Sequence, residues 1–147
     1  MPDRTPATIL LIEDDPGHAR LIERNLRRAQ IDNEIILFAD GQQALEYLCT
    51  DRAAAGAAQG VPRLIILDLN LPGLDGYQVL EQLKSSHRTR HIPVIILTTT
   101  DEPRDIERCY ALGCNAYMTK PVEYEQFAGA IRSLGLLLSV IQIPRGA

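Results

Sequence analysis

Acidic, hydroxyl and basic side chains stand where four apolar runs of the sequence end. Glu13 and Asp14 follow the first run, Asp68 follows a later one, and Thr98 and Lys120 end the last two. Crowded carboxylates repel one another unless a cation joins them, and a few carboxylates with waters are the usual ligands of Mg²⁺. With a lysine and a hydroxyl, such an ion can hold a phosphoryl group that a carboxylate attacks. The spacing predicts this chemistry but does not decide whether Asp14 or Asp68 is the nucleophile.

Five apolar runs are the candidate strands that position these side chains. The first four are continuous, which is typical of strands covered on both faces. Helical patterns separate the runs, and we expect Gly113 and Gly135 to close the last two helices. Five β-α units predict one α/β domain with a doubly wound parallel sheet, whose strand ends share one edge. The expected strands are 8–12, 34–38, 64–67, 94–98 and 116–119, and the expected helices are 16–30, 41–54, 75–86, 103–112 and 123–134.

The overall composition narrows the class of protein. A chain of 147 residues is the size of one ordinary domain, and its net charge of −4 gives no general attraction to nucleic acid or anionic membranes. No apolar run approaches the roughly 20 residues that span a bilayer. The three cysteines are irregularly spaced, so we expect neither a disulfide framework nor a zinc site. Free cysteines fit a reducing compartment, and we therefore expect a cytoplasmic protein.

Four motifs in order resemble the receiver domain of response regulators in two-component signalling. They are ILLIEDD from Ile9, LIILDLNLPGLDG from Leu64, PVIILTT from Pro93 and YMTKP from Tyr117. The resemblance covers residues 7–134, which we expect to form the receiver domain, preceded by a short lead over 1–6 and followed by a tail over 135–147. It implies the flavodoxin-like (βα)₅ fold that the alternation of elements also predicts.

The resemblance assigns a role to each acidic residue at the strand ends. Asp68 becomes the phosphoacceptor in a Mg²⁺-dependent reaction. Asp14 would bind Mg²⁺ directly and Glu13 through water, while Asp68 and the backbone carbonyl of Asn70 would complete the protein ligands.

The resemblance also assigns the residues that handle the phosphoryl group. Thr98 would donate its hydroxyl to it, and Lys120 would pair with it and, before phosphorylation, with Asp68. The Lys120–Pro121 peptide would be cis, which proline permits. Thr98 and Tyr117 would form the switch, with the aromatic ring following the threonine inward.

A receiver takes its phosphoryl group from a histidine kinase, which is therefore the expected partner. The arginine face of 16–30, with Leu21 at its border, is a candidate docking surface, although a solvated helix face would have the same pattern. The long segment 52–62 and the end of the domain resemble phytochrome-associated response regulators. That narrower resemblance implies a bacteriophytochrome as the kinase.

The last stretch, LLLSVIQIPRGA from Leu136, is apolar although the five-strand core is already complete. Exposed apolar strips usually meet a partner, and Val140 to Ile143 is rich in β-formers. We therefore expect a homodimer in which the tail of each chain reaches across to the other chain. The alternative is a longer last helix that lies on its own domain.

Two other functions use a similar architecture, a Mg²⁺-dependent phosphohydrolase with an aspartyl nucleophile and a flavin-binding protein. The hydrolase needs a second acid, but Asp68-Leu69-Asn70 lacks it, and acids stand where a flavin protein has its phosphate loop. We expect no enzyme beyond the protein's own phosphoryl transfer. His87 and His91 are expected to be exposed loop residues, and His18 a solvated helix residue near the acidic edge.

Overall fold

A computed structural model describes residues 8–48 and 62–142, and from residue 135 onward it describes the backbone alone. The elements of this part alternate as predicted, with five strands and five helices between and after them. They are β1 (Thr8–Ile12), α1 (Pro16–Arg28), β2 (Glu34–Phe38), α2 (Gly41–Leu48), β3 (Pro62–Asp68), α4 (Gly76–Ser85), β4 (Val94–Thr98), α5 (Pro103–Ala111), β5 (Ala116–Thr119) and α6 (Tyr124–Gln142).

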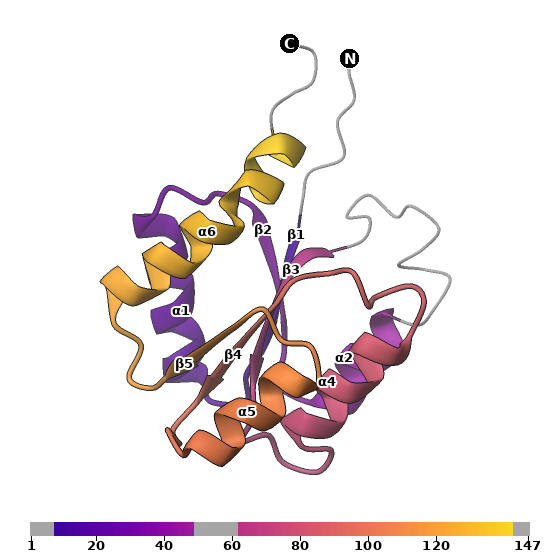
Figure 1. Cartoon of the computed structure of the whole chain (residues 1–147). Helices are drawn as coiled ribbons and strands as arrows, with labels where there is room; N and C mark the ends of the chain where they lie inside the picture. Colours follow the sequence, from indigo (N-terminus) through magenta and orange to yellow (C-terminus); the bar gives the residue numbers. More distant parts are fainter. Residues whose placement is uncertain (1–7, 49–61, 143–147) are drawn as a thin grey trace.

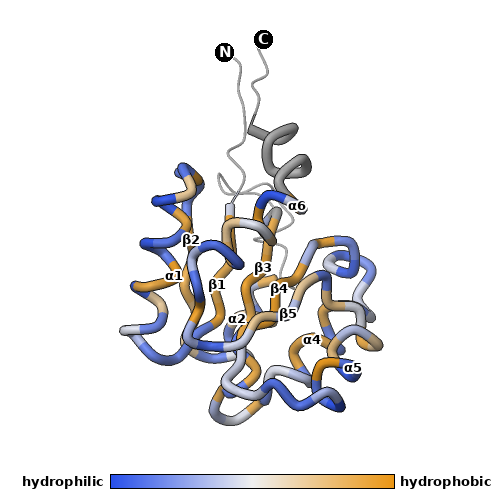
Figure 2. Tube along the Cα trace, turned by 60° about the vertical axis from the view of Figure 1, so that its left-hand side comes forward, coloured by the Kyte–Doolittle hydropathy of each residue, from blue (hydrophilic) through white to orange (hydrophobic). Residues whose placement is uncertain are grey.

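All four strand pairs are parallel, and the strand order is β2-β1-β3-β4-β5. Helices α1 and α6 cover one face of the sheet, and α2, α4 and α5 cover the other (Figure 1). Apolar residues lie along the strands and polar ones on the outer sides of the helices (Figure 2). This is the predicted doubly wound fold, and it brings the carboxyl ends of β1, β3, β4 and β5 to one edge.

The edge strand β2 differs from the expectation that all four continuous runs are covered on both faces. Glu34 is exposed and Leu37 is 51% exposed. The prediction was wrong here because an apolar pattern does not say which strand ends at the border of the sheet. The three inner strands are buried along their described length.

Helix α6 also differs from its prediction, because it continues through Gly135 to Gln142. A glycine inside a helix costs about 1 kcal/mol, and the leucines that follow are good helix formers. The expected strand-like conformation from Val140 is therefore wrong up to Gln142, and residues 143–147 lie outside the described residues. So does most of the predicted loop at 52–62.

Local signals in the sequence fix the two helices that begin beside the strand ends. Asp15 caps α1 by accepting hydrogen bonds from the backbone N–H groups of Gly17 and His18, and Pro16 occupies the first turn. Asp75 caps α4 in a capping box with Gln78. Helix α1 therefore begins two residues after Asp14, and α4 begins eight residues after Asp68. No helix in 8–48 or 62–142 has the length and apolar character needed to cross a membrane.

Candidate phosphoryl-transfer site

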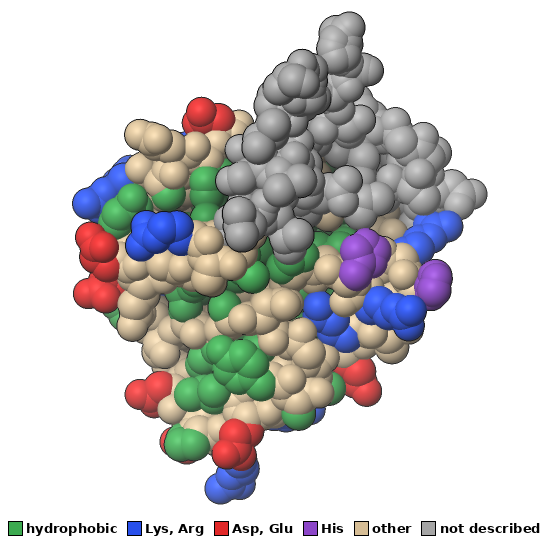
Figure 3. Space-filling view, turned by 45° about the horizontal axis from the view of Figure 1, so that its top comes forward, with side chains coloured by type: hydrophobic (Ala, Val, Ile, Leu, Met, Phe, Trp, Pro, Cys, Tyr) green, Lys and Arg blue, Asp and Glu red, His purple; other side chains and the backbone are tan. Residues whose placement is uncertain are grey.

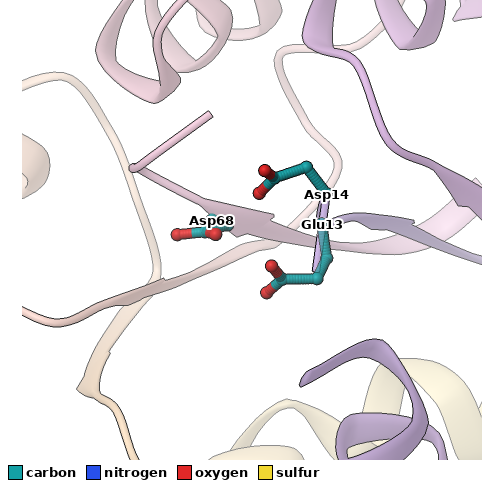
Figure 4. A group of neighbouring side chains, drawn as sticks. All are labelled: Glu13, Asp14 and Asp68. Atoms are coloured by element: carbon teal, nitrogen blue, oxygen red, sulfur yellow. The ribbon is translucent and has the colours of Figure 1, made fainter. Parts of the chain in front are cut away.

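Three carboxylates meet at the carboxyl edge of the sheet. Glu13 and Asp14 follow β1, Asp68 ends β3, and one oxygen from each lies within 4.8 Å of the others. The three side chains point to the same side of the strand tips (Figure 4). Glu13 and Asp68 are each 2% exposed, whereas Asp14 is exposed to solvent. The sheet thus joins acids that are more than fifty positions apart in the sequence.

Lys120 follows β5 and supplies positive charge to this group. Its Nζ lies 2.8 Å from Oε1 of Glu13 and 3.1 Å from Oδ2 of Asp68. Burial alone would lower the pKa of Lys120, but the hydrogen bonds and charges of the two carboxylates outweigh burial and raise it. The lysine is therefore held as an ammonium group. The Lys120–Pro121 peptide is cis, as predicted.

The single ammonium group does not compensate for all of the negative charge. Burial raises the pKa of Glu13, and the charge of Asp68 raises it further, although the hydrogen bond from Lys120 opposes the shift. Oxygen ligands from three clustered carboxylates suit a hard divalent ion such as Mg²⁺, with Asp14 open to a hydrated ion on the solvent side. The residues therefore fit the predicted metal.

Asn70 and Thr98 lie beside Asp68. The backbone N–H of Asn70 donates to Oδ1 of Asp68 at 3.0 Å, and its side-chain amide donates to Oγ1 of Thr98 at 3.4 Å and of Thr99 at 3.2 Å. Thr98 is fully buried. The two Asp68 oxygens thus have different partners, since Oδ1 accepts from backbone and Oδ2 from Lys120.

The turn after Asp68 depends on a glycine. A Cβ added to Gly76 would lie 2.4 Å from Cα of Leu69 and 2.9 Å from the carbonyl oxygen of Asp68, so only glycine allows this close approach of the two backbones. The N–H of Gly76 donates to the carbonyl of Leu69 at 3.1 Å. The start of α4 therefore fixes the backbone on which Asp68 stands.

Tyr117 is half-buried on β5, and its hydroxyl donates to the carbonyl of Thr100 at 2.7 Å. The Thr100 hydroxyl lies 3.4 Å from Oδ2 of Asp105, whose other oxygen accepts from the Tyr77 hydroxyl at 2.7 Å. Tyr117 was predicted from the sequence as a switch residue, but the links from Thr100 through Asp105 to Tyr77 on α4 were not. No motif in the sequence pairs a helix tyrosine with an aspartate 28 positions later.

His18 lies near the acidic edge, as predicted, and makes a contact there that the sequence did not predict. It is exposed, as expected, but its Nδ1 lies 3.1 Å from Nζ of Lys120 and 3.8 Å from Oε2 of Glu13. No pattern in the sequence shows that the third residue of α1 faces the end of β5, a contact across 102 positions. Beside it the surface has a mainly apolar hollow, lined by His18, Leu21, Ile22, Lys120, Pro121 and Val122.

The other two histidines stand apart from the acidic edge. His87 and His91 are exposed in the connection before β4, and Arg88 and Arg90 alternate with them. Histidine side chains on the face in Figure 3 have Lys or Arg neighbours. Within the described residues, the three carboxylates are the one group with the composition and spacing of a metal site.

Comparison with known proteins agrees with this geometry. The family model described as "Response regulator receiver domain" matches residues 9–132. A receiver domain structure from Rhodospirillum rubrum is 57% identical, with a TM-score of 0.74 over 94% of this chain and 97% of that one. The bacteriophytochrome response regulator RtBRR is 44% identical, with a TM-score of 0.76 over 88% and 78%. The probable methanogenesis regulatory protein FilR2 of Methanothrix harundinacea is 40% identical over 88% of this chain and 81% of its own length.

A further structural relative carries a metal. The receiver domain of the sensor histidine kinase PA1611 from Pseudomonas aeruginosa has a magnesium ion coordinated in its active-site cleft. It is 30% identical, with a TM-score of 0.70 over 88% of this chain and 98% of that one. The family match spans most of the chain, and the fold and acidic edge agree with it. The chain belongs to the response regulator receiver domain family.

Proposed function

We propose that this protein accepts a phosphoryl group from a histidine kinase on Asp68, in a reaction that requires Mg²⁺. The observation that carries the proposal is the position of Asp68 between Lys120 and the Glu13–Asp14 pair, with Oδ2 3.1 Å from the ammonium group. An oxygen of Asp68 would form a bond to phosphorus as the bond from phosphorus to the kinase histidine breaks. The electron pair of that bond returns to the imidazole.

The surroundings of Asp68 favour it over Asp14 as the nucleophile. Asp68 is buried and its Oδ1 is fixed by the N–H of Asn70, so the carboxylate has one orientation. Asp14 is exposed and better placed to hold a hydrated ion. We assign Asp14, Glu13, Asp68 and the Asn70 carbonyl to Mg²⁺, which when bound would supply positive charge for the transferring phosphoryl oxygens.

Thr98 and Lys120 would bind the phosphoryl oxygens. Lys120 already lies between the two buried carboxylates, and Thr98 lies within reach of Asn70 beside Asp68. We propose Thr98 and Tyr117 as the switch. For Tyr117 to follow Thr98 inward, its hydroxyl has to leave the Thr100 carbonyl, which it now contacts at 2.7 Å.

The kinase would dock on α1 and the adjacent apolar hollow. Arg27 donates to the carbonyls of Ile31 and Asn33, and Arg28 stacks on Tyr124, so these two arginines are occupied within the domain. The surface available to the kinase is therefore Arg20 and Arg24 with Leu21. The likeness to the bacteriophytochrome response regulator RtBRR supports a bacteriophytochrome as the kinase.

We further propose a cytoplasmic homodimer that has no catalytic output beyond its own phosphoryl transfer. The apolar sequence from Leu136 supports a role for the C-terminal segment in the dimer. The alternative, a phosphohydrolase, lacks support because Asn70 stands where such an enzyme needs its second acid. Sedimentation of the full chain beside a chain ending at Gly135 tests the dimer, and equal masses would rule out the C-terminal segment as its cause.

Phosphorylation by a small donor tests the proposed chemistry without knowledge of the kinase. The protein is incubated with acetyl phosphate and Mg²⁺, and its intact mass is measured with and without EDTA. We expect one added phosphoryl group in the wild type, none in Asp68→Asn and none in EDTA. Asp101→Asn is the matched control, because Asp101 is an exposed acid near the same edge, and it should react like the wild type. Equal labelling of Asp68→Asn would refute the proposal.

A further inference from the structure

Three acceptors surround the Lys120 ammonium group. They are Oε1 of Glu13 at 2.8 Å, Oδ2 of Asp68 at 3.1 Å and Nδ1 of His18 at 3.1 Å. An ammonium group has three protons and accepts nothing, so each of these atoms takes one proton. This requires Nδ1 of His18 to be unprotonated, with the ring proton on Nε2. Lys120 therefore has no donor left for an incoming group.

The three acceptors do not hold the ammonium equally. The carboxylates of Glu13 and Asp68 are buried and carry the charge opposite to the ammonium group, so each of these contacts adds the attraction of an ion pair to the hydrogen bond. The ring of His18 offers Lys120 only the lone pair of Nδ1, without the attraction of an ion pair, and its side chain is 47% exposed, so water can replace this contact. His18 is thus the partner that Lys120 gives up most easily.

We infer that His18 is a positioning residue that occupies the third proton of Lys120 in the unphosphorylated protein and releases it to a phosphoryl oxygen. This rests on the proposed function, and it adds a competitor to that reaction. A contact present in the ground state and lost in the transition state raises the barrier to reaction. His18 therefore restrains phosphorylation, and its release after transfer changes the border of the hollow that includes Leu21 and Val122.

A pair of variants with the same side-chain shape isolates the acceptor. His18→Leu and His18→Asn differ in whether they can accept a hydrogen bond near the position of Nδ1, and both sit at an exposed position of α1. With acetyl phosphate and saturating Mg²⁺, we expect His18→Leu to be phosphorylated about fivefold faster than the wild type, the effect of losing one hydrogen bond to a partly exposed acceptor. His18→Asn should keep the wild-type rate. Circular dichroism checks that both variants are folded.

Imidazole ¹⁵N NMR gives a second readout that does not depend on rates. The chain has three histidines, and His87 and His91 are exposed controls. With Mg²⁺ present, His18 should show a single tautomer with the proton on Nε2. On adding beryllofluoride, an analogue of the phosphoryl group, its signals should move toward those of the two controls, and in Asp68→Asn they should stay unchanged.

The outcomes separate this inference from the proposed function. If the wild type takes up no phosphoryl group, the proposed function fails, and the inference fails with it. If the wild type is phosphorylated but His18→Leu reacts no faster than His18→Asn, the inference alone is wrong. An imidazole spectrum of His18 that beryllofluoride leaves unchanged in the wild type would also overturn it.

Discussion

Replacing Lys120 by methionine should make the stability of the protein depend strongly on Mg²⁺. The change keeps most of the side-chain volume but removes the cation that lies 2.8 Å and 3.1 Å from the buried carboxylates of Glu13 and Asp68. Removing one partner of a buried ion pair costs about 3–5 kcal/mol. Because the site opens at the sheet edge, we expect about 3 kcal/mol in EDTA at pH 8, a large part of the stability of an ordinary domain.

Mg²⁺ and low pH should each restore much of this loss. Mg²⁺ replaces the missing positive charge. Without Lys120, the pKa of Glu13, already raised by burial, should rise further. An acid with a raised pKa in the folded state favours folding below its unfolded pKa, about 4.5, and loses that contribution as the pH rises through its folded pKa. The variant should therefore approach the wild type near pH 4.5 and fall away toward pH 8.

Urea unfolding followed by circular dichroism measures this effect, since the chain has no tryptophan. With a slope of about 1.5 kcal/mol per molar urea, the midpoint in EDTA should drop by about 2 M. Lys84→Met is the matched control. Lys84 donates to the backbone carbonyls of Arg90 and Ile92, so its loss should be smaller and unaffected by Mg²⁺. A Lys120→Met protein as stable as the wild type in EDTA at pH 8 would refute the reasoning.

Three further predictions follow from the same contacts. Gly76→Ala should destabilise the fold by about 1–3 kcal/mol in urea unfolding, because its Cβ would overlap Leu69, whereas Gly129→Ala on α6, with no atom within 4 Å, should stabilise it slightly. Asp14→Asn should be at least as stable as the wild type in EDTA, because one repulsive charge is gone, but lose most of the rise in Tm with Mg²⁺, and an undiminished rise would be the contrary result. Burial raises the pKa of Cys109 to about 11 and of Cys114 to about 12, so peptide mapping should find both unalkylated by iodoacetamide at pH 8 until the protein unfolds.

The sequence predicted the acidic edge because parallel topology decides where strand ends go. Asp68 and Lys120 lie 52 positions apart, yet knowing that both end parallel strands was enough to bring them together. The nearness of His18 to the acidic edge was predictable from its place in the sequence, but its contact with Lys120 was not. Its contact with Lys120 depends on the rotation of α1 about its axis and on the path of the chain after β5.

Strand order and helix ends were also beyond the sequence pattern. Leu37 on β2 stands between apolar residues in the sequence, as the buried strand residues do. It is exposed because β2 lies at the border of the sheet. Gly113 follows the end of α5 and has a positive φ of 107°, as expected of a glycine that closes a helix. Gly135 does not end α6, because a glycine permits a helix to stop but does not force it.

Locating the phosphoryl group within the chain tests the central claim most directly. Borohydride reduces an aspartyl phosphate to homoserine, and trypsin places the two candidate nucleophiles in separate peptides, 5–20 with Asp14 and 64–84 with Asp68. After phosphorylation in Mg²⁺, reduction and digestion, mass spectrometry should find homoserine at position 68. Homoserine at position 14, or unchanged aspartate in both peptides of a protein that carries phosphate, would contradict the account.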